Sequence, residues 1–164
     1  MRPSKPTFHV VLFRPEIPPN TGNIARLCVG ANCHLHLIKP LGFSLDEKQV
    51  RRAGLDYWEH LSLTVHETYY DFIEENQPGD RVFLITKFGP TRYTDVSFQH
   101  GDVLVFGSET KGLPAALRDQ YPASRLLHIP MTRNVRSLNL SNACAILMYE
   151  GLRQVMAGSE NLLS

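Results

Sequence analysis

The sequence predicts an α/β fold with a mostly parallel central sheet and helices on both faces. Short apolar segments alternate with segments of helical periodicity along the chain, which is typical of strand-helix units. Residues 82–86 (VFLIT) and 103–106 (VLVF) are almost wholly apolar, as central strands covered on both faces are. The 164 residues show no repeat or linker and predict one domain over 1–164, with flexible tails at 1–7 and 158–164.

The first half of the chain predicts three strands and three helices. Residues 8–13 (FHVVLF) are an apolar run flanked by prolines, which indicates a buried strand. Three prolines interrupt 14–19, so we expect that segment to be non-helical. Asn20 is a suitable N-cap for a helix that ends near Asn32. The other elements expected here are a strand at 35–38, a helix at 46–53, a strand at 62–66 and a helix at 67–75.

The second half predicts the two central strands, a helix beginning at Pro114, a strand at 126–129 and a last helix at 138–156. The last helix carries two neighbouring apolar stripes: Leu140, Cys144, Leu147 and Val155, and Ala145, Met148, Leu152 and Met156. A helix packed on one sheet needs only one apolar face. Either the monomer covers both stripes or one meets a second copy, and we expect a homodimer through this helix.

Composition narrows the class of protein. Hydrophobic residues make up 43% and charged residues 20% of the chain, which is ordinary for a globular protein. No apolar run approaches the roughly 18 residues of a membrane span, and the N-terminus lacks the apolar centre of a signal peptide. We therefore expect a cytoplasmic protein without membrane contact. The net charge of +1 means that a nucleic acid would have to be held by a local basic patch.

The cysteines and histidines give no sign of a metal or disulfide framework. Cys28, Cys33 and Cys144 form no CxxC pair, and we interpret them as small buried hydrophobic residues. The seven histidines are scattered along the chain, so the sequence predicts no metal site.

Three polar loops follow predicted strands: 18–26 (PPNTGNIAR), 107–114 (GSETKGLP) and 129–143 (IPMTRNVRSLNLSNA). Ligands of parallel α/β sheets bind at the carboxyl ends of the strands, where these loops would meet. The third loop is crowded with hydroxyl, amide and guanidinium groups, although it could also be a polar loop that ends in a helix cap. Arg26 points away from the apolar stripe of its helix, toward solvent or a cleft.

The sequence lacks the motifs of several common classes of nucleotide-binding proteins and enzymes. The 107–114 loop lacks the Gly-Lys-Ser/Thr of nucleotide-triphosphate loops and the GxGxxG of dinucleotide sites, and its glycines could simply form a tight turn before a helix. No Gly-x-Ser-x-Gly elbow is present, which argues against a hydrolase. The residues alone therefore indicate an α/β ligand-binding domain with a polar site near these loops.

In this order, and with 51–58 (RRAGLDYW), the three loops resemble the SPOUT class of S-adenosyl-L-methionine (AdoMet)-dependent RNA methyltransferases over essentially the whole chain. The resemblance is nearest to the YibK-like (TrmL) group, which methylates the ribose 2′-oxygen of the wobble pyrimidine nucleotide in certain leucine tRNAs. It implies a trefoil knot near the C-terminus, AdoMet as the cofactor, tRNA as the partner and a homodimer through the last helix.

The resemblance also implies site residues, carried over by position in the motifs. The cofactor pocket would be formed by Ile85, Thr86, Gly107, Ile129, Met131, Ser137 and Leu138. The catalytic positions would be Asn20, Arg26, Glu109, Ser137 and Asn139. The tRNA would be contacted by Arg26, Arg52, Arg133, Tyr149 and Arg153. The segment Lys87-Phe88-Gly89 departs from the Thr-Lys-Gly expected at that place.

Arg26 is expected to act on the reacting ribose either as a base or as a clamp. We favour the clamp, because a guanidinium with a pKa above about 12 rarely gives up its proton. A positive strip across two subunits is expected to bind the RNA and would consist of Lys48, Arg51, Arg52, Arg133, Arg136 and Arg153. Two alternatives stay open: methylation of another RNA, and a module that binds AdoMet or RNA without catalysis.

Overall fold

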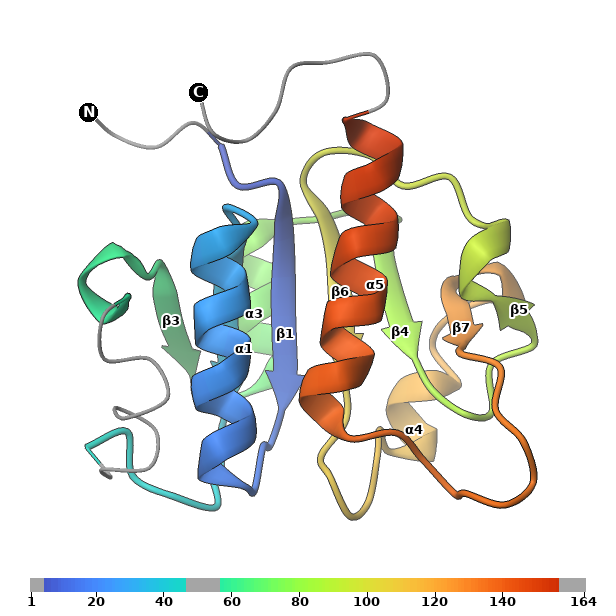
Figure 1. Ribbon diagram of the computed structural model, residues 1–164, viewed down its shortest axis with the longest axis horizontal. Helices are drawn as coiled ribbons and strands as arrows, with labels where there is room; N and C mark the ends of the chain where they lie inside the picture. Colours follow the sequence, from blue (N-terminus) through green and yellow to red (C-terminus); the bar gives the residue numbers. More distant parts are fainter. Residues whose placement is uncertain (1–4, 47–56, 157–164) are drawn as a thin grey trace.

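The computed structural model describes residues 5–46 and 57–156, which form a seven-stranded sheet with helices on both faces. The strand order is β3-β2-β1-β6-β4-β7-β5, and every neighbouring pair is parallel (Figure 1). The strands are β1 (Phe8–Phe13), β2 (His34–Ile38), β3 (Leu63–His66), β4 (Val82–Ile85), β5 (Thr91–Arg92), β6 (Asp102–Phe106) and β7 (Leu126–His128). The predicted parallel α/β fold is therefore confirmed.

The helices form a layer on each face of the sheet. They are α1 (Pro18–Gly30), α3 (Tyr69–Asn76), α4 (Ala115–Arg118) and α5 (Leu140–Val155), with short 3-10 helices η1 (Trp58–His60), η2 (Tyr93–Asp95) and η3 (Ala123–Arg125). Helices α1 and α5 lie side by side in front of the sheet, and α3 and α4 lie behind it (Figure 1).

The alternation of β1 shows how the two layers are built. Val10 and Leu12 belong to the apolar cluster that contains α1 and α5, whereas Val11 and Phe13 belong to the cluster that contains Phe72 of α3. Successive side chains of a strand point to opposite faces of the sheet. A strand with apolar residues at both odd and even positions therefore contributes to the core on each face. The continuous apolar runs of the sequence thus place β1, β4 and β6 in the middle of the sheet.

Helix α1 begins earlier than the sequence indicated. Asn20 is not its N-cap: Pro18 and Pro19 occupy the first turn, and Ile17 is the N-cap. The expectation that 14–19 would be non-helical was wrong for these two prolines, because the first N–H groups of a helix need no intrahelical acceptor and proline is tolerated there. Asn20 is consequently free to turn its side chain toward the neighbouring loops.

Other element boundaries differ by a few residues. Thr68 and Asp71 form a capping box, so α3 begins at Tyr69 and not at 67. Pro114 is the N-cap of α4 and not its first helical residue. The two-residue strand β5 was not predicted, and the helix expected at 46–53 lies outside the described residues except for Asp46. Thr7, expected in a flexible tail, is buried and donates its N–H to Asn32 O at 2.7 Å.

Helix α5 buries residues of both its apolar stripes within the monomer. Cys144 and Leu147 of the first stripe and Met148 and Leu152 of the second are all buried. Helix α1 covers part of α5, which explains the wide apolar surface without a second copy. The double stripe is thus no evidence for a dimer, and an interface would have to use the outward residues of α5, among them Tyr149, which is 49% exposed.

The three cysteines are free and buried, as predicted. Burial raises the pKa of all three thiols, that of Cys33 to about 12, so they stay protonated and unreactive at neutral pH. Within residues 5–46 and 57–156, no helix has both the length and the apolarity needed to cross a membrane. The strand order leaves β7 between β4 and β5, which accords with a C-terminal knot, and the knot itself stays a prediction.

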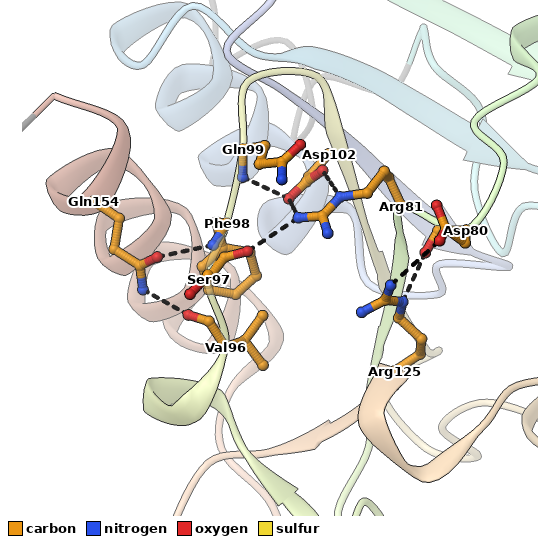
Figure 2. Close-up of polar contacts among 9 residues, drawn as sticks. All are labelled: Asp80, Arg81, Val96, Ser97, Phe98, Gln99, Asp102, Arg125 and Gln154. Carbon is orange, nitrogen blue, oxygen red and sulfur yellow. Dashed lines mark hydrogen bonds and ion pairs between the residues drawn. The ribbon is translucent and has the colours of Figure 1, made fainter.

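A buried ion pair fixes the segment that leads into β6. Asp102 is 1% exposed, and its carboxylate accepts from Arg81 Nε at 2.8 Å, from Arg81 Nη2 at 2.7 Å and from the backbone N–H of Gln99 at 2.7 Å. Gln154 of α5 bonds the same segment through Val96 O and the N–H of Phe98 (Figure 2). The network therefore connects α5, β4 and β6 at the end of the sheet away from the polar loops.

Replacing Asp102 with alanine is expected to lower the free energy of unfolding by about 3 kcal/mol. The substitution removes three charge-assisted hydrogen bonds and leaves the Arg81 guanidinium partly buried without its partner. Denaturation in urea would measure the change. Asp95→Ala is the matched control, because Asp95 is exposed and its loss should cost less than about 0.5 kcal/mol. Equal costs for the two variants would contradict the role given to Asp102.

Candidate functional site

A cavity of about 510 Å³ opens at the carboxyl ends of β4, β6 and β7. Its walls come from the start of α1, the loops after these three strands and the start of α5. This volume falls in the range of cofactor and drug-sized ligand sites. The three polar loops of the sequence thus meet at one place, as parallel strands require.

All seven positions expected to hold the cofactor line this cavity: Ile85, Thr86, Gly107, Ile129, Met131, Ser137 and Leu138. Four of the five positions expected to be catalytic also line it: Asn20, Glu109, Ser137 and Asn139. The structure therefore brings together residues that lie up to 119 positions apart in the chain. Their individual roles remain predictions.

Gly107 lines the cavity at a point where two stretches of its own loop pack closely together. A Cβ atom on this residue would lie 2.2 Å from the carbonyl carbon of Gly112 and 2.4 Å from the N of Leu113. The loop folds back here, since Ser108 and Gly112 form a bridge and Gly112 has a φ of 64°. The 107–114 loop therefore forms the tight turn that its glycines allow, and the residues of this turn line the cavity.

A line of hydrogen bonds joins the three loops at the cavity edge. The Glu109 carboxylate accepts from the N–H of Glu16 at 2.9 Å, the N–H of Ile17 at 2.7 Å and Asn20 Nδ2 at 3.2 Å. Asn139 Nδ2 then donates to Asn20 Oδ1 at 3.1 Å. Glu109 therefore carries its charge at the N-terminus of α1, where the helix dipole favours it, and orients Asn20 through a fixed acceptor.

Asn139 has two tasks at once. Its Oδ1 accepts from the N–H of Ser141 at 2.9 Å and from the N–H of Asn142 at 3.3 Å, so it is the N-cap of α5. Its Nδ2 holds Asn20 at the cavity. The cap interpretation of this loop is thus confirmed for Asn139, and the same side chain belongs to the cavity wall.

Glu16 reinforces the junction between the first two loops. Its Oε1 accepts from Thr110 Oγ1 at 2.7 Å, and the hydrogen bond from the Thr110 side chain lowers the pKa of Glu16. Reciprocal carboxylate contacts of Glu16 and Glu109 therefore hold the start of α1 against the 107–114 loop.

Several cavity residues were not predicted as cofactor or catalytic positions. Lys87, Phe88, Lys111 and Arg136 all line the cavity and bring basic and aromatic groups to its rim. Phe88 is 62% exposed, and the Arg118 guanidinium lies 4.3 Å from its ring centroid. An exposed aromatic ring held by a cation is suited to stacking on a base, and only its position directly after a central strand could have signalled this from the sequence.

Some residues expected at the site lie elsewhere. Arg26, Arg133, Tyr149 and Arg153 are exposed and are absent from the described residues that line the cavity. The Arg26 guanidinium packs 5.0 Å from the ring centroid of Tyr57, and Arg153 pairs with Glu150 at 2.9 Å. Arg52 lies outside the described residues. The cavity of one chain thus holds the cofactor positions and four catalytic positions without Arg26.

The walls of the cavity suit AdoMet. Ile85, Ile129 and Leu138 offer apolar surface for an adenine ring, and Gly107 contributes to the wall where the backbone of Gly112 and Leu113 packs against it. Glu109 and the amide of Asn139 supply polar groups to the same cavity. The chain thus provides an apolar cleft with a polar rim, which is what a nucleoside linked to an amino acid requires.

Known proteins resemble this chain in sequence and in structure. A "tRNA (cytidine(34)-2'-O)-methyltransferase" of Methylovorus glucosotrophus is 52% identical over 147 residues, which are 90% of this chain and 95% of that protein. A solved structure concerned with the 2-OH methylation of C/U34 on tRNA is 43% identical, has a TM-score of 0.86 and covers 92% of this chain and 97% of its own.

A third likeness bears on the cofactor. A SpoU methyltransferase from Streptomyces viridochromogenes, solved in complex with AdoMet, is 26% identical with a TM-score of 0.77; the match covers 93% of this chain and 62% of that one. The model of the SpoU rRNA methylase family matches residues 7–149. The chain therefore belongs to the SpoU family of AdoMet-dependent methylases.

Proposed function

We propose that this protein transfers a methyl group from AdoMet to the ribose 2′-oxygen of the wobble pyrimidine nucleotide of leucine tRNAs, in the cytoplasm. The observation that carries the proposal is the cavity itself, which is lined by all seven cofactor positions and edged by the linked side chains of Asn20, Glu109 and Asn139. The relatives named for cytidine-34 methylation support the choice of nucleotide.

The reaction asks the protein for placement and charge compensation. Bound AdoMet supplies an electrophilic methyl group on its sulfonium. The protein has to hold the 2′-oxygen in line and stabilise the negative charge that develops as its proton leaves. Asn20 is oriented for this by Glu109 on one side and Asn139 on the other, so its amide can hold a ribose hydroxyl in a fixed direction.

The proposal includes a homodimer in which Arg26 completes the cavity of the other subunit. Arg26 is exposed on α1 and does not line the cavity of its own chain. Helix α1 packs beside α5, where the exposed Tyr149 offers an aromatic side chain to an interface. A second copy docked on α1 and α5 would bring Arg26 to the neighbouring cavity, where its guanidinium can grip a phosphate next to the reacting ribose.

Substrate choice is tested with purified transcripts. The enzyme would be incubated with labelled AdoMet and either leucine tRNAs or tRNAs of other specificities that carry a pyrimidine at the wobble position. Transfer to leucine tRNAs alone supports the full proposal, whereas transfer to all of them would remove the leucine restriction. A fragment of ribosomal RNA tests the alternative that the family description suggests.

A binding module without catalysis is the second candidate. Such a module would bind AdoMet in the cavity and leave every RNA unmodified. The fixed orientation of Asn20 argues against it, because mere cofactor binding would not need a polar side chain held by two partners. Cofactor binding without transfer to any tRNA or ribosomal RNA fragment would favour the module.

Binding of tRNA is expected to weaken steeply with salt. Arg133 and Arg136 are exposed on the loop before α5, whereas the charge of Arg153 is partly compensated by Glu150. Each arginine that contacts a phosphate contributes about one to the slope of log affinity against log salt. Arg133→Gln and Arg136→Gln should each lower the slope by about 1 in a filter-binding titration.

The matched control is Lys5→Gln, since Lys5 is exposed near the amino end of β1, away from the cavity. The control should leave the slope unchanged. A binding curve that is flat in salt, or a control that lowers the slope as much as the arginine variants, would contradict the proposed basic surface.

A further inference from the structure

Four histidines gather on one face of the sheet, on the neighbouring strands β1, β2 and β3. His9 of β1 pairs in register with His34 of β2, while His36 lies two residues further along β2 and His66 lies on β3. The cluster cannot be recognised from the sequence, because it comes from three segments that are far apart along the chain and meet only when three parallel strands pair. Helix α3 covers two of its members, since the Phe72 ring packs edge-on against His36 at 4.8 Å and against His66 at 5.5 Å.

We propose that His9, His34 and His36 form a binding site for a divalent transition-metal ion of the zinc class. One nitrogen from each residue can be chosen so that all three lie within 4.8 Å of one another. Three imidazoles are an established ligand set for zinc, and imidazole also suits cobalt, nickel and copper. The His-x-His spacing in β2 puts two ligands on one face of a strand, and β1 supplies the third.

Neighbouring side chains form hydrogen bonds with the histidine ligands. His36 Nδ1 lies 3.0 Å from His66 Nε2, and His66 Nδ1 lies 3.3 Å from the Glu75 carboxylate. His34 Nε2 lies 2.8 Å from Thr64 Oγ1. His36 therefore has Nδ1 held by His66, as the outer nitrogen of a metal-bound histidine is held, while its Nε2 is bonded to His9 and would have to exchange that hydrogen bond for the metal ion. His34 has Nε2 bonded to Thr64, which leaves Nδ1 for the metal ion.

Glu75 fixes the direction of the hydrogen-bonded chain. Its carboxylate accepts from His66 Nδ1, so His66 Nε2 must accept from His36 Nδ1, and His36 Nε2 must accept from His9 Nδ1 at 2.9 Å. A metal ion would replace the last of these protons. The displaced proton moves to His9 Nε2, which leaves all three ligands neutral and releases no proton to the solvent.

Binding requires the ligands to move, and His34 most of all, because the three nitrogens are now spread over as much as 4.8 Å. Two nitrogens on a tetrahedral zinc are about 3.3 Å apart, so His9 and His36 would separate by about 0.4 Å. The rings of His34 and His36 are stacked at 4.1 Å, and His34 would turn so that the ion lies in its ring plane. His34 is half-buried at the first position of β2, and the turn would break its hydrogen bond to Thr64. Burial lowers the pKa of all three imidazoles, which keeps their lone pairs available at neutral pH.

The proposal is tested on the full chain without a histidine tag, after treatment with EDTA. Zn²⁺ would be titrated by calorimetry, and Co²⁺ by the visible absorption of a tetrahedral complex. We expect one equivalent of either ion to bind. His9→Gln and His34→Gln should weaken Zn²⁺ binding at least ~10-fold, and Glu75→Gln, which acts through His66, should weaken it about 10-fold.

His100→Gln is the matched control, because His100 is exposed and lies outside the cluster. It should bind Zn²⁺ as the unmodified protein does. His36 is buried, so its variant could fail to fold, and the two half-buried positions keep the test decisive. No binding at about millimolar Zn²⁺, or binding that persists undiminished in the His9 and His34 variants, would overturn the site.

Discussion

Replacing Gly107 with alanine is expected to weaken AdoMet binding at least ~100-fold, or about 2.7 kcal/mol. The added Cβ would lie 2.2 Å from the carbonyl carbon of Gly112, and backbone atoms cannot move aside as a flexible side chain can. The 107–113 loop would have to shift, and with it Glu109 and the start of α1 that Glu109 holds. Isothermal titration with AdoMet would measure the loss.

Gly30→Ala is the matched control for this substitution. Gly30 ends α1, and a Cβ atom there meets nothing within 4 Å. The control should bind AdoMet with unchanged affinity. Normal AdoMet binding by Gly107→Ala would mean that the cofactor does not depend on the close packing of the loop at Gly107. That result would contradict the assignment of the cavity as the AdoMet site.

Replacing Arg26 with alanine is expected to lower turnover by about 10²–10³-fold while AdoMet binding stays within about twofold. Arg26 is absent from the cavity wall of its own chain, so its loss should leave the cofactor contacts intact. Arg26→Lys should recover only part of the activity, because an ammonium cannot form the paired hydrogen bonds of a guanidinium with a phosphate. Equal losses of turnover and cofactor affinity would contradict the clamp role.

The proposed action of Arg26 across the dimer can be tested by mixing two variants, at an AdoMet concentration that saturates the unmodified cavity but leaves the Gly107→Ala cavity empty. In a mixed dimer of Arg26→Ala and Gly107→Ala chains, the intact cavity of the first faces the intact Arg26 of the second. Random pairing should then restore about a quarter of the wild-type activity. If Arg26 served its own chain, the mixed dimer would contain no complete site and would stay inactive.

The sequence predicted β1, β4 and β6 well because each of these strands is an almost continuous apolar run. Strand β1 was predicted at its observed boundaries, and β4 and β6 within one residue, since covered strands need apolar side chains on both faces. The two residues of β5 carry too little pattern to be recognised. The start of α1 was misplaced, because proline was treated as a helix breaker where it is tolerated in the first turn.

The sequence motifs predicted which loops form the candidate site, but not how the side chains of these loops are arranged in space. The resemblance supplied positions such as Gly107 and Leu138, which the structure does bring to one cavity. Distances between loops depend on how the sheet is ordered, and nothing in the local sequence shows that Arg26 lies outside the cavity wall. The histidine cluster was hidden for the same reason, because its members come from three strands.

The most direct measurement of the central claim is the position of the transferred methyl group. Purified protein would be incubated with labelled AdoMet and tRNA from cells that lack wobble ribose methylation, and the product would be digested with nuclease and analysed by mass spectrometry. The account predicts one methyl on the 2′-oxygen of the wobble pyrimidine nucleotide. A methyl on a base or at another nucleotide, or no transfer while AdoMet remains bound, would contradict it.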